Sequence, residues 1–197
     1  TPLYAAAYGE SRDVCRLLLS AGADVNGRNA SGDTPLHGAA RAGNADVAGL
    51  LVDAGAGLDL QDDHLQTPLH VAAMESPEVI RLLCAEGAQV DAPARNGTTP
   101  LHYAVTHDNL DCVNALLEAG ADPGLKMGGG SILYAAIGGG QKEDVVMRLL
   151  QHPEIEPTIH AAAALGDEEM VREMLREDPL AAWTRDERNY NALMYAA

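Results

Sequence analysis

TPLH at residues 34–37 returns unchanged at residues 67–70 and 99–102 and divides the chain into repeated segments. Looser copies keep the same spacing, with TPLY at 1–4, SILY at 131–134, PTIH at 157–160 and NALM at 191–194. The segments start near residues 1, 34, 67, 99, 131, 157 and 191, about 33 residues apart except for a short fifth segment. This regular return of one motif indicates a repeat protein over residues 1–197.

Each residue of the motif suits the start of a helix. Thr34 is a good N-cap, Pro35 fits the first helical position because no donor is needed there, and Leu36 begins the buried face. His37 falls at the third helical position, where its imidazole can bond back to the cap as a glutamate does in a capping box. Three further histidines share this position: His70, His102 and His160. We therefore predict structural histidines rather than metal ligands or catalytic bases.

A second helix is predicted after a short turn in each segment. Its apolar residues recur at helical spacing, and Gly22, Gly55 and Gly120 mark the ends of three such helices. Residues that can cap the second helices precede them: Asn44, Ser76, Asn109 and Asp167. The residues that follow each second helix then form a loop that leads into the next motif.

The TPLH start, the paired helices and the GADVN ending at residues 22–26 together resemble the ankyrin repeat. The resemblance covers the whole chain and implies an all-α ankyrin-repeat solenoid. In that fold each unit is a helix, a turn, a second helix and a projecting loop resembling a β-hairpin. We expect one elongated array over residues 1–197. Because the first and last copies are truncated, we expect this array to be a segment of a longer protein.

The fifth segment breaks the pattern. GGG fills residues 128–130 and again 138–140, and residues 152–157 leave no room for a full loop. We expect loosely held connections there and the weakest junction between segments five and six. The phosphate-binding pattern GxxxxGK followed by Ser or Thr is absent, so the glycines are interpreted as turn residues.

Two bulky residues also depart from the plan. Leu65 stands where the family normally has glycine, which we expect to change the shape of the second loop's tip. Trp183 is expected to pack at the base of the loop at residues 186–190.

The net charge of the chain limits the classes of partner that we expect it to bind. The chain has 29 acidic and 13 basic residues and a net charge of −16, which argues against binding to nucleic acid or to an anionic membrane surface. A partner protein with a basic surface is favoured, although acidity that merely keeps an array soluble explains the charge equally well. No apolar run is long enough to span a membrane.

Cys15, Cys84 and Cys112 form no CxxC pair and are interpreted as buried free thiols, which suits an intracellular, cytoplasmic location.

No catalytic, metal or cofactor motif is found, since GxSxG, HExxH, CxxC pairs and the nucleotide fingerprints are all absent. We therefore predict no enzymatic activity and no cofactor. The resemblance implies a protein–protein interaction module, of the stand-alone or scaffold type, that binds through a concave face of loop tips and first helices. A second interpretation stays open, in which the array is the recognition or regulatory arm of a larger multidomain enzyme or channel.

The family's variable contact positions, carried over residue by residue, define the predicted binding surface. They lie at the loop tips and on the exposed side of the first helices. These residues are Asp33, Arg41, Ala42, Asp62, Asp63, His64, Gln66, Met74, Glu75, Arg95, Asn96, Thr98, Thr106, His107 and Met127. The acidic members motivate a partner with a basic patch. Arg41 and Arg95 either pair with those acids within the array or contact the partner themselves.

Overall fold

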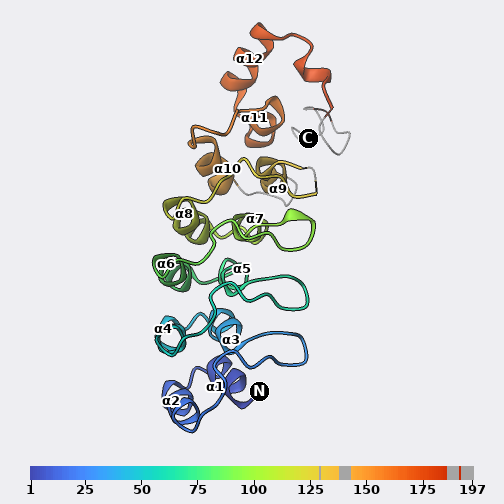
Figure 1. The fold of residues 1–197 in the computed structure, drawn as a ribbon. Coiled ribbons are helices and arrows are strands. Elements are labelled where there is room, and N and C mark those ends of the chain that lie inside the picture. Colours follow the sequence, from blue (N-terminus) through green and yellow to red (C-terminus); the bar gives the residue numbers. More distant parts are fainter. Residues whose placement is uncertain (129, 138–142, 186–190, 192–197) are drawn as a thin grey trace. The chain divides into compact units, whose positions relative to one another are not determined.

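The computed structural model describes residues 1–128, 130–137, 143–185 and 191. Contacts divide the chain into two compact units, Thr1–Asp122 (unit 1) and Pro123–Ala197 (unit 2). The described residues contain helices and loops but no strand, apart from one isolated bridge between Met127 and Gly130 (Figure 1). The all-α prediction is confirmed, and one continuous array over residues 1–197 stays a prediction.

Unit 1, which the structure describes in full, consists of helix pairs stacked in two layers. The first helices form one layer, the second helices form the other, and the loops project from the first-helix side (Figure 1). The first helices are α1 (Pro2–Tyr8), α3 (Pro35–Ala42), α5 (Pro68–Ala72) and α7 (Pro100–Thr106). The second helices are α2 (Arg12–Ser20), α4 (Ala45–Asp53), α6 (Pro77–Ala85) and α8 (Leu110–Glu118). We name the connections loop 1 (21–34), loop 2 (54–67) and loop 3 (86–99), the last of which contains the 3-10 turn η1 (Arg95–Gly97).

The TPLH motif starts three helices of unit 1 as predicted. In the first copy, the backbone N–H of Thr34 donates to Nδ1 of His37 at 3.1 Å, and the threonine Oγ1 lies 2.8 Å from the same nitrogen. The copies at residues 67–70 and 99–102 repeat both contacts. All three histidine side chains are buried. Their predicted structural role at the helix start is confirmed.

His160 departs from this geometry. It is the second residue of α11 (Ile159–Leu165), whose N-cap Thr158 accepts a hydrogen bond from the N–H of Ala161 at 3.2 Å. The imidazole Nε2 of His160 instead lies 3.3 Å from the carbonyl oxygen of Thr184. Pro and Thr are exchanged in PTIH, so the cap moves one residue closer to the histidine. The prediction that His160 shares the third helical position is therefore wrong.

The predicted caps of the second helices are mostly confirmed. Asn44, Asn109 and Asp167 each accept a hydrogen bond from a backbone N–H of the first turn, at 2.9, 3.0 and 3.0 Å. Ser76 occupies the N-cap position of α6 without a capping bond from its side chain. Pro77 still takes the first helical position, so α6 begins where the sequence predicts.

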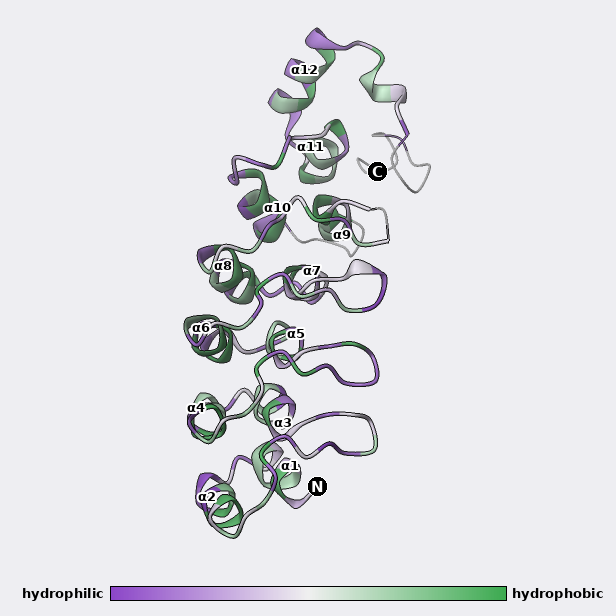
Figure 2. Ribbon diagram, viewed as in Figure 1, coloured by the Kyte–Doolittle hydropathy of each residue, from purple (hydrophilic) through white to green (hydrophobic). Residues whose placement is uncertain are grey.

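The core of unit 1 is aliphatic and fills the space between the two layers. The second residue after each first-helix cap is buried: Leu3, Leu36, Leu69 and Leu101. Helices α1 and α3 approach closely because residue 38 is glycine. A Cβ at Gly38 would lie 3.1 Å from the carbonyl oxygen of Tyr4 and 3.2 Å from its ring. Hydrophilic residues predominate in the loops of unit 1 and hydrophobic ones in helices such as α4, α6 and α8 (Figure 2).

Unit 2 contains further helix pairs. Its described helices are α9 (Ile132–Ile137), α10 (Glu143–Leu150), α11, α12 (Glu168–Glu177) and the 3-10 turn η2 (Ala181–Trp183). Backbone hydrogen bonds of 3.0 and 2.9 Å between Met127 and Gly130 close the turn that we expect to be loosely held. The second glycine run, at residues 138–140, lies outside the described residues.

The packing of unit 2 is thin around its last helix. Ile159 and Ala163 of α11 are buried and pack against partly buried residues of α12 and η2, whereas α12 itself has no buried residue. Trp183 is 68% exposed. The loop against which we expect it to pack, residues 186–190, lies outside the described residues.

Candidate functional site

The three loops of unit 1 are joined to one another by hydrogen bonds. The Arg28 guanidinium of loop 1 donates to the carbonyl oxygen of Gln61 in loop 2. The Gln61 side-chain amide donates to the carbonyl oxygen of Pro93 in loop 3 at 3.2 Å. Arg95 of loop 3 donates back to the carbonyl oxygen of Asp63 at 2.7 Å. Each of the three loops is therefore hydrogen-bonded to a neighbouring loop.

The buried histidines tie the helix starts to the same loops. Nδ1 accepts the bond from the threonine N–H, so the proton of the neutral ring lies on Nε2. From there His37 donates to the carbonyl oxygen of Gln66 at 3.0 Å, and His70 donates to that of Thr98 at 3.1 Å. Burial lowers the pKa of both rings, that of His70 to about 4. Both histidines are therefore neutral at physiological pH, and each links its helix start to the loop that leads into the next repeat.

The loop bases carry a second set of links between neighbouring repeats. In each, a side-chain oxygen of one segment accepts a hydrogen bond from a backbone N–H of the next. The pairs are Asn26 with Gly57 at 2.8 Å, Asp59 with Gln89 at 2.9 Å and Asp91 with Asp122 at 3.1 Å. Two acidic residues, Asp59 and Asp91, thus make contacts within unit 1, although Asp59 remains exposed.

Two of the predicted contact residues, Asp33 and Asp62, are buried, each about 5% exposed. The Asp33 carboxylate accepts hydrogen bonds from Asn29 at 3.0 Å and from Arg41 at 3.2 Å. Burial raises the pKa of Asp33, but the bonds from Asn29 and Arg41 outweigh it and hold the pKa below its ordinary value. Asp62 accepts from the backbone N–H groups of His64 and Gln66, both at 2.8 Å. We assign both carboxylates to loop structure.

Arg41 lies in the last turn of α3 and connects that helix to loop 1 and to α1. Besides Asp33, its guanidinium donates to the Tyr4 hydroxyl of α1 at 2.7 Å. Its positive charge is therefore paired within unit 1. Of the two interpretations offered for Arg41 and Arg95, the structure supports internal contacts for both, although Arg95 meets a backbone carbonyl rather than a carboxylate.

The remaining predicted contact residues lie at or near the surface. Those that are exposed are Asp63, His64, Glu75, Arg95, Asn96, Thr106 and His107. Those that are half-buried are Ala42, Gln66, Met74, Thr98 and Met127. Met127 belongs to unit 2, so unit 1 brings together the others on its loops and first helices.

Aromatic residues that the sequence reasoning omits extend this surface. Tyr103 stacks on His107 with ring centroids 6.3 Å apart, and its hydroxyl accepts a hydrogen bond from the Gln66 side chain at 2.6 Å. Tyr4 and Tyr8 form a second stacked pair with centroids 6.4 Å apart. Tyr103 directly follows TPLH, a position that differs in each copy, and that variability beside a fixed motif is a signal that could have identified it.

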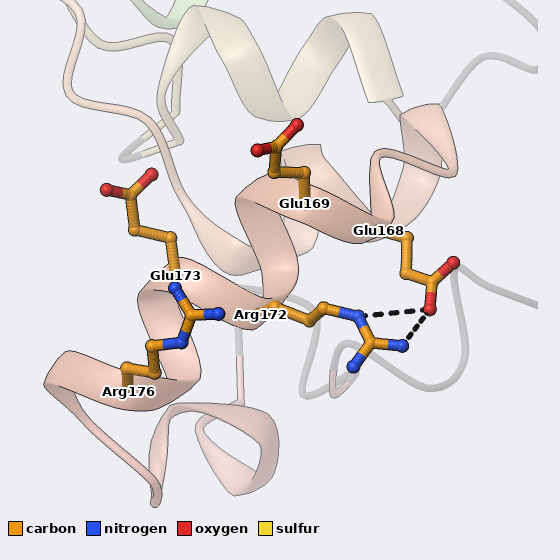
Figure 3. Close-up of a pocket in the computed structure, with 5 residues that line it drawn as sticks. All are labelled: Glu168, Glu169, Arg172, Glu173 and Arg176. Atoms are coloured by element: carbon orange, nitrogen blue, oxygen red, sulfur yellow. Dashed lines mark hydrogen bonds and ion pairs between the residues drawn. The ribbon is translucent and has the colours of Figure 1, made fainter.

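An open hollow on α12 is lined by charged side chains of that helix alone (Figure 3). They are Glu168, Glu169, Arg172, Glu173 and Arg176, all exposed. The Arg172 guanidinium pairs with Glu168 one turn away. Because the side chains come from one helix and face solvent, we interpret this as a solvated helix surface rather than a ligand site.

The described part of the chain offers neither a metal centre nor a reactive thiol. Within it, no group of three or more His, Cys, Asp or Glu side chains is placed to hold a metal ion. Cys15 and Cys112 are buried and Cys84 is half-buried, and all three are free thiols. Burial raises the pKa of Cys84 to about 11 and that of Cys112 to about 12, which keeps both protonated. None of the described helices is long and apolar enough to cross a membrane.

Comparison with known proteins agrees with this architecture. A family model described as ankyrin repeats in three copies matches residues 1–62 and 50–127. The chain belongs to the ankyrin-repeat family, whose members generally act as protein–protein interaction modules.

Curated relatives share a short stretch with the chain. The ankyrin repeat and LEM domain-containing protein 1 homolog of Caenorhabditis elegans is 52% identical over 48 residues, which is 24% of this chain and 7% of that protein. Human BCL-6 corepressor-like protein 1 is 44% identical over 48 residues, 24% of this chain and 3% of its own length. Human ankyrin repeat and SOCS box protein 16 is 41% identical over 51 residues, 26% of this chain and 11% of its own length. The chain thus matches only a small part of these longer proteins.

Proposed function

We propose that unit 1 binds a partner protein across its loops and the exposed side of its first helices. The observation that carries this proposal is the set of hydrogen bonds by which Arg28, Gln61 and Arg95 join the three loops. A loop surface that is already ordered loses little conformational entropy on binding. Buried helix starts support the loops from beneath, so their exposed side chains can vary without loss of the fold.

The centre of the proposed surface is aromatic and apolar. Met74 lies just beyond the end of α5 and is half-buried, and Tyr103 of α7 stacks on His107 at the C-cap of that helix. Tyrosine and methionine are both enriched at protein interfaces relative to other surfaces. We propose that these residues supply most of the binding energy.

Basic groups on the partner are proposed to meet the exposed carboxylates of Asp63 and Glu75. This electrostatic contribution is smaller than the net charge of −16 suggests, because Asp33 and Asp62 bond within their loops. We propose no catalytic step and no cofactor for these residues. The free thiols favour a reducing, cytoplasmic setting for this interaction.

A second candidate function is the recognition arm of a larger enzyme or channel. It is favoured by the relatives, which share with this chain a segment that is a small fraction of their own length. Two of them are named for a LEM domain or a SOCS box in addition to their ankyrin repeats. The binding surface of unit 1 would be the same in either case.

Site-specific photo-crosslinking tests the proposed surface. A photoreactive amino acid replaces Met74 or His107, and matched controls carry it at Asp46 or Asp111, which are exposed on the second helices. We expect one common partner to be cross-linked, in extracts of the source cells, from the first-helix positions and not from the controls. Cross-linking that is confined to Asp46 and Asp111, or equal at all four positions, would contradict the proposal.

Charge reversal then separates the electrostatic part. Asp63→Lys and Glu75→Lys should slow association with the identified partner at low salt and much less at high salt. Met74→Ala and His107→Ala should speed its dissociation instead. If the association rate responds neither to charge reversal nor to salt, the proposed basic partner is wrong and only the apolar contacts of the proposal stand.

A further inference from the structure

The three loops of unit 1 each contain a left-handed residue at the same position, two residues before the TPLH threonine. Gly32 has φ 76°, Leu65 has φ 63° and Gly97 has φ 75°. The left-handed conformation brings a Cβ close to the following carbonyl oxygen, so glycine is the usual residue there. Loop 2 therefore keeps the backbone of its neighbours with a side chain that this backbone disfavours.

Burial of the Leu65 side chain offsets the cost of its left-handed backbone only in part. Leu65 is 45% exposed, which places it among the large hydrophobic side chains that unit 1 displays to solvent. The turn around it is held by other groups, since Asp62 accepts bonds from His64 and Gln66, and the Leu65 N–H donates to the Asp62 carbonyl oxygen at 3.0 Å. These hydrogen bonds hold the turn without using the leucine side chain.

Polar and charged groups border this leucine. Asp63 and His64 are exposed beside it, and Gln66 is half-buried on its other side. Arg95 of loop 3 reaches the Asp63 carbonyl oxygen with one guanidinium nitrogen while its side chain stays exposed. An apolar centre within a polar border is the arrangement found at energetically important contacts of protein interfaces.

We propose that Leu65 determines the specificity of loop 2 for its partner, which is a protein segment whose apolar side chains pack on this leucine. The exposed Asp63 carboxylate calls for a basic side chain on that segment, and the Arg95 guanidinium calls for an acidic one. This inference rests on the proposed function, because it assigns a contact within the surface proposed above.

Peptide selection tests the inference without a known partner. Random peptides displayed on phage are selected on the full 197-residue chain, and the affinities of the selected peptides are measured for variants at residue 65. Leu65→Gly gives loop 2 the residue of loops 1 and 3. Leu65→Asn keeps a residue that tolerates the left-handed backbone but removes the apolar surface. Leu65→Met keeps the apolar surface. Thermal unfolding should show an unchanged or higher midpoint for the Gly and Asn variants, which verifies that the loop is intact.

We expect the Gly and Asn variants to bind the selected peptides about tenfold more weakly or worse, and the Met variant to stay within about threefold of the original chain. Asn-variant affinities within about threefold of the original, or a Met variant as weak as the Asn variant, would overturn the inference. Met74→Ala, measured alongside, distinguishes the two proposals. Binding lost with Met74→Ala but kept with Leu65→Asn overturns the role of Leu65 alone, and binding kept in both overturns the role of Leu65 and the proposed surface together.

Discussion

Helices of unit 1 and unit 2 come from related sequence segments but begin in different ways. In unit 1, His37 and His70 are buried, and each bonds both its own helix start and the loop that leads into the next segment. In unit 2, the N-cap Thr158 of α11 is exposed, and its His160 is half-buried. Helix α12 buries none of its residues. The difference shows that a helix of the same repeat type can begin with a less buried histidine that still contacts a following loop, here at Thr184.

Hydrogen exchange should show this difference most strongly. We expect the amides of α3, α5 and α7 to exchange at least about 100-fold more slowly than those of α11 and α12, because local opening requires less buried contact to be broken in unit 2. The same measurement checks our expectation that the junction of segments five and six is the weakest. For this, the exchange rates of the amides of residues 143–157 are compared with those of unit 1. Equal protection in the two units would show that the buried histidine contacts contribute little.

Matched histidine substitutions should give the next largest difference between the two units. His70→Ala removes bonds to the Thr67 N–H and the Thr98 carbonyl oxygen and leaves a cavity, so we expect the free energy of unfolding to fall by about 2 to 4 kcal/mol. His160→Ala removes a half-buried contact to Thr184 and should lower it by less than about 1 kcal/mol. Urea unfolding of the full chain measures both. A larger effect at His160 would reverse the comparison.

The sequence predicts the helix starts well because the motif is local. Thr34, Pro35 and His37 act within one helical turn, so their spacing in the sequence is enough to predict the geometry of the helix start. The error at His160 could have been avoided on the same grounds. In PTIH the threonine directly precedes the isoleucine, which moves the cap and leaves the histidine one position too early.

The binding surface is predicted less well because loop side chains depend on contacts between segments. Asp62 and Asp63 are adjacent and chemically alike, yet the first is buried beneath its loop and the second is exposed. Their orientation follows from bonds to His64 and Gln66 and from the neighbouring loops. No local pattern distinguishes such a pair. Leu65, by contrast, was identifiable as unusual, since a glycine is expected at its position.

Acid should destabilise unit 1 through the same histidines. Burial lowers the pKa of folded His70 to about 4 from an unfolded value of 6.5. The stability of the neutral ring is thus fully present above pH 6.5 and is lost as the pH falls towards 4, because the unfolded chain binds the proton first. We expect His70 to account for a loss of about 2 kcal/mol at pH 5. His70→Gln should flatten the difference between unfolding midpoints at pH 7 and pH 5. A pH dependence that the substitution leaves unchanged would assign the effect to other groups.

The smallest expected difference concerns two arginine pairs. In unit 1, Arg41 pairs with Asp33, whose side chain is 7% exposed, whereas in unit 2 Arg172 pairs with a Glu168 side chain that is 74% exposed. Arg41→Met leaves the Asp33 carboxylate buried without its cation and removes the bond to the Tyr4 hydroxyl, so we expect a loss of about 1 to 2 kcal/mol. Arg172→Met breaks a solvated pair and should cost at most about 0.5 kcal/mol, less still in high salt. Urea unfolding at low and high salt measures both losses. Equal losses would mean that burial of the carboxylate does not distinguish the pairs, and a double variant with Asp33→Asn that recovers stability would confirm that the unpaired carboxylate causes the loss.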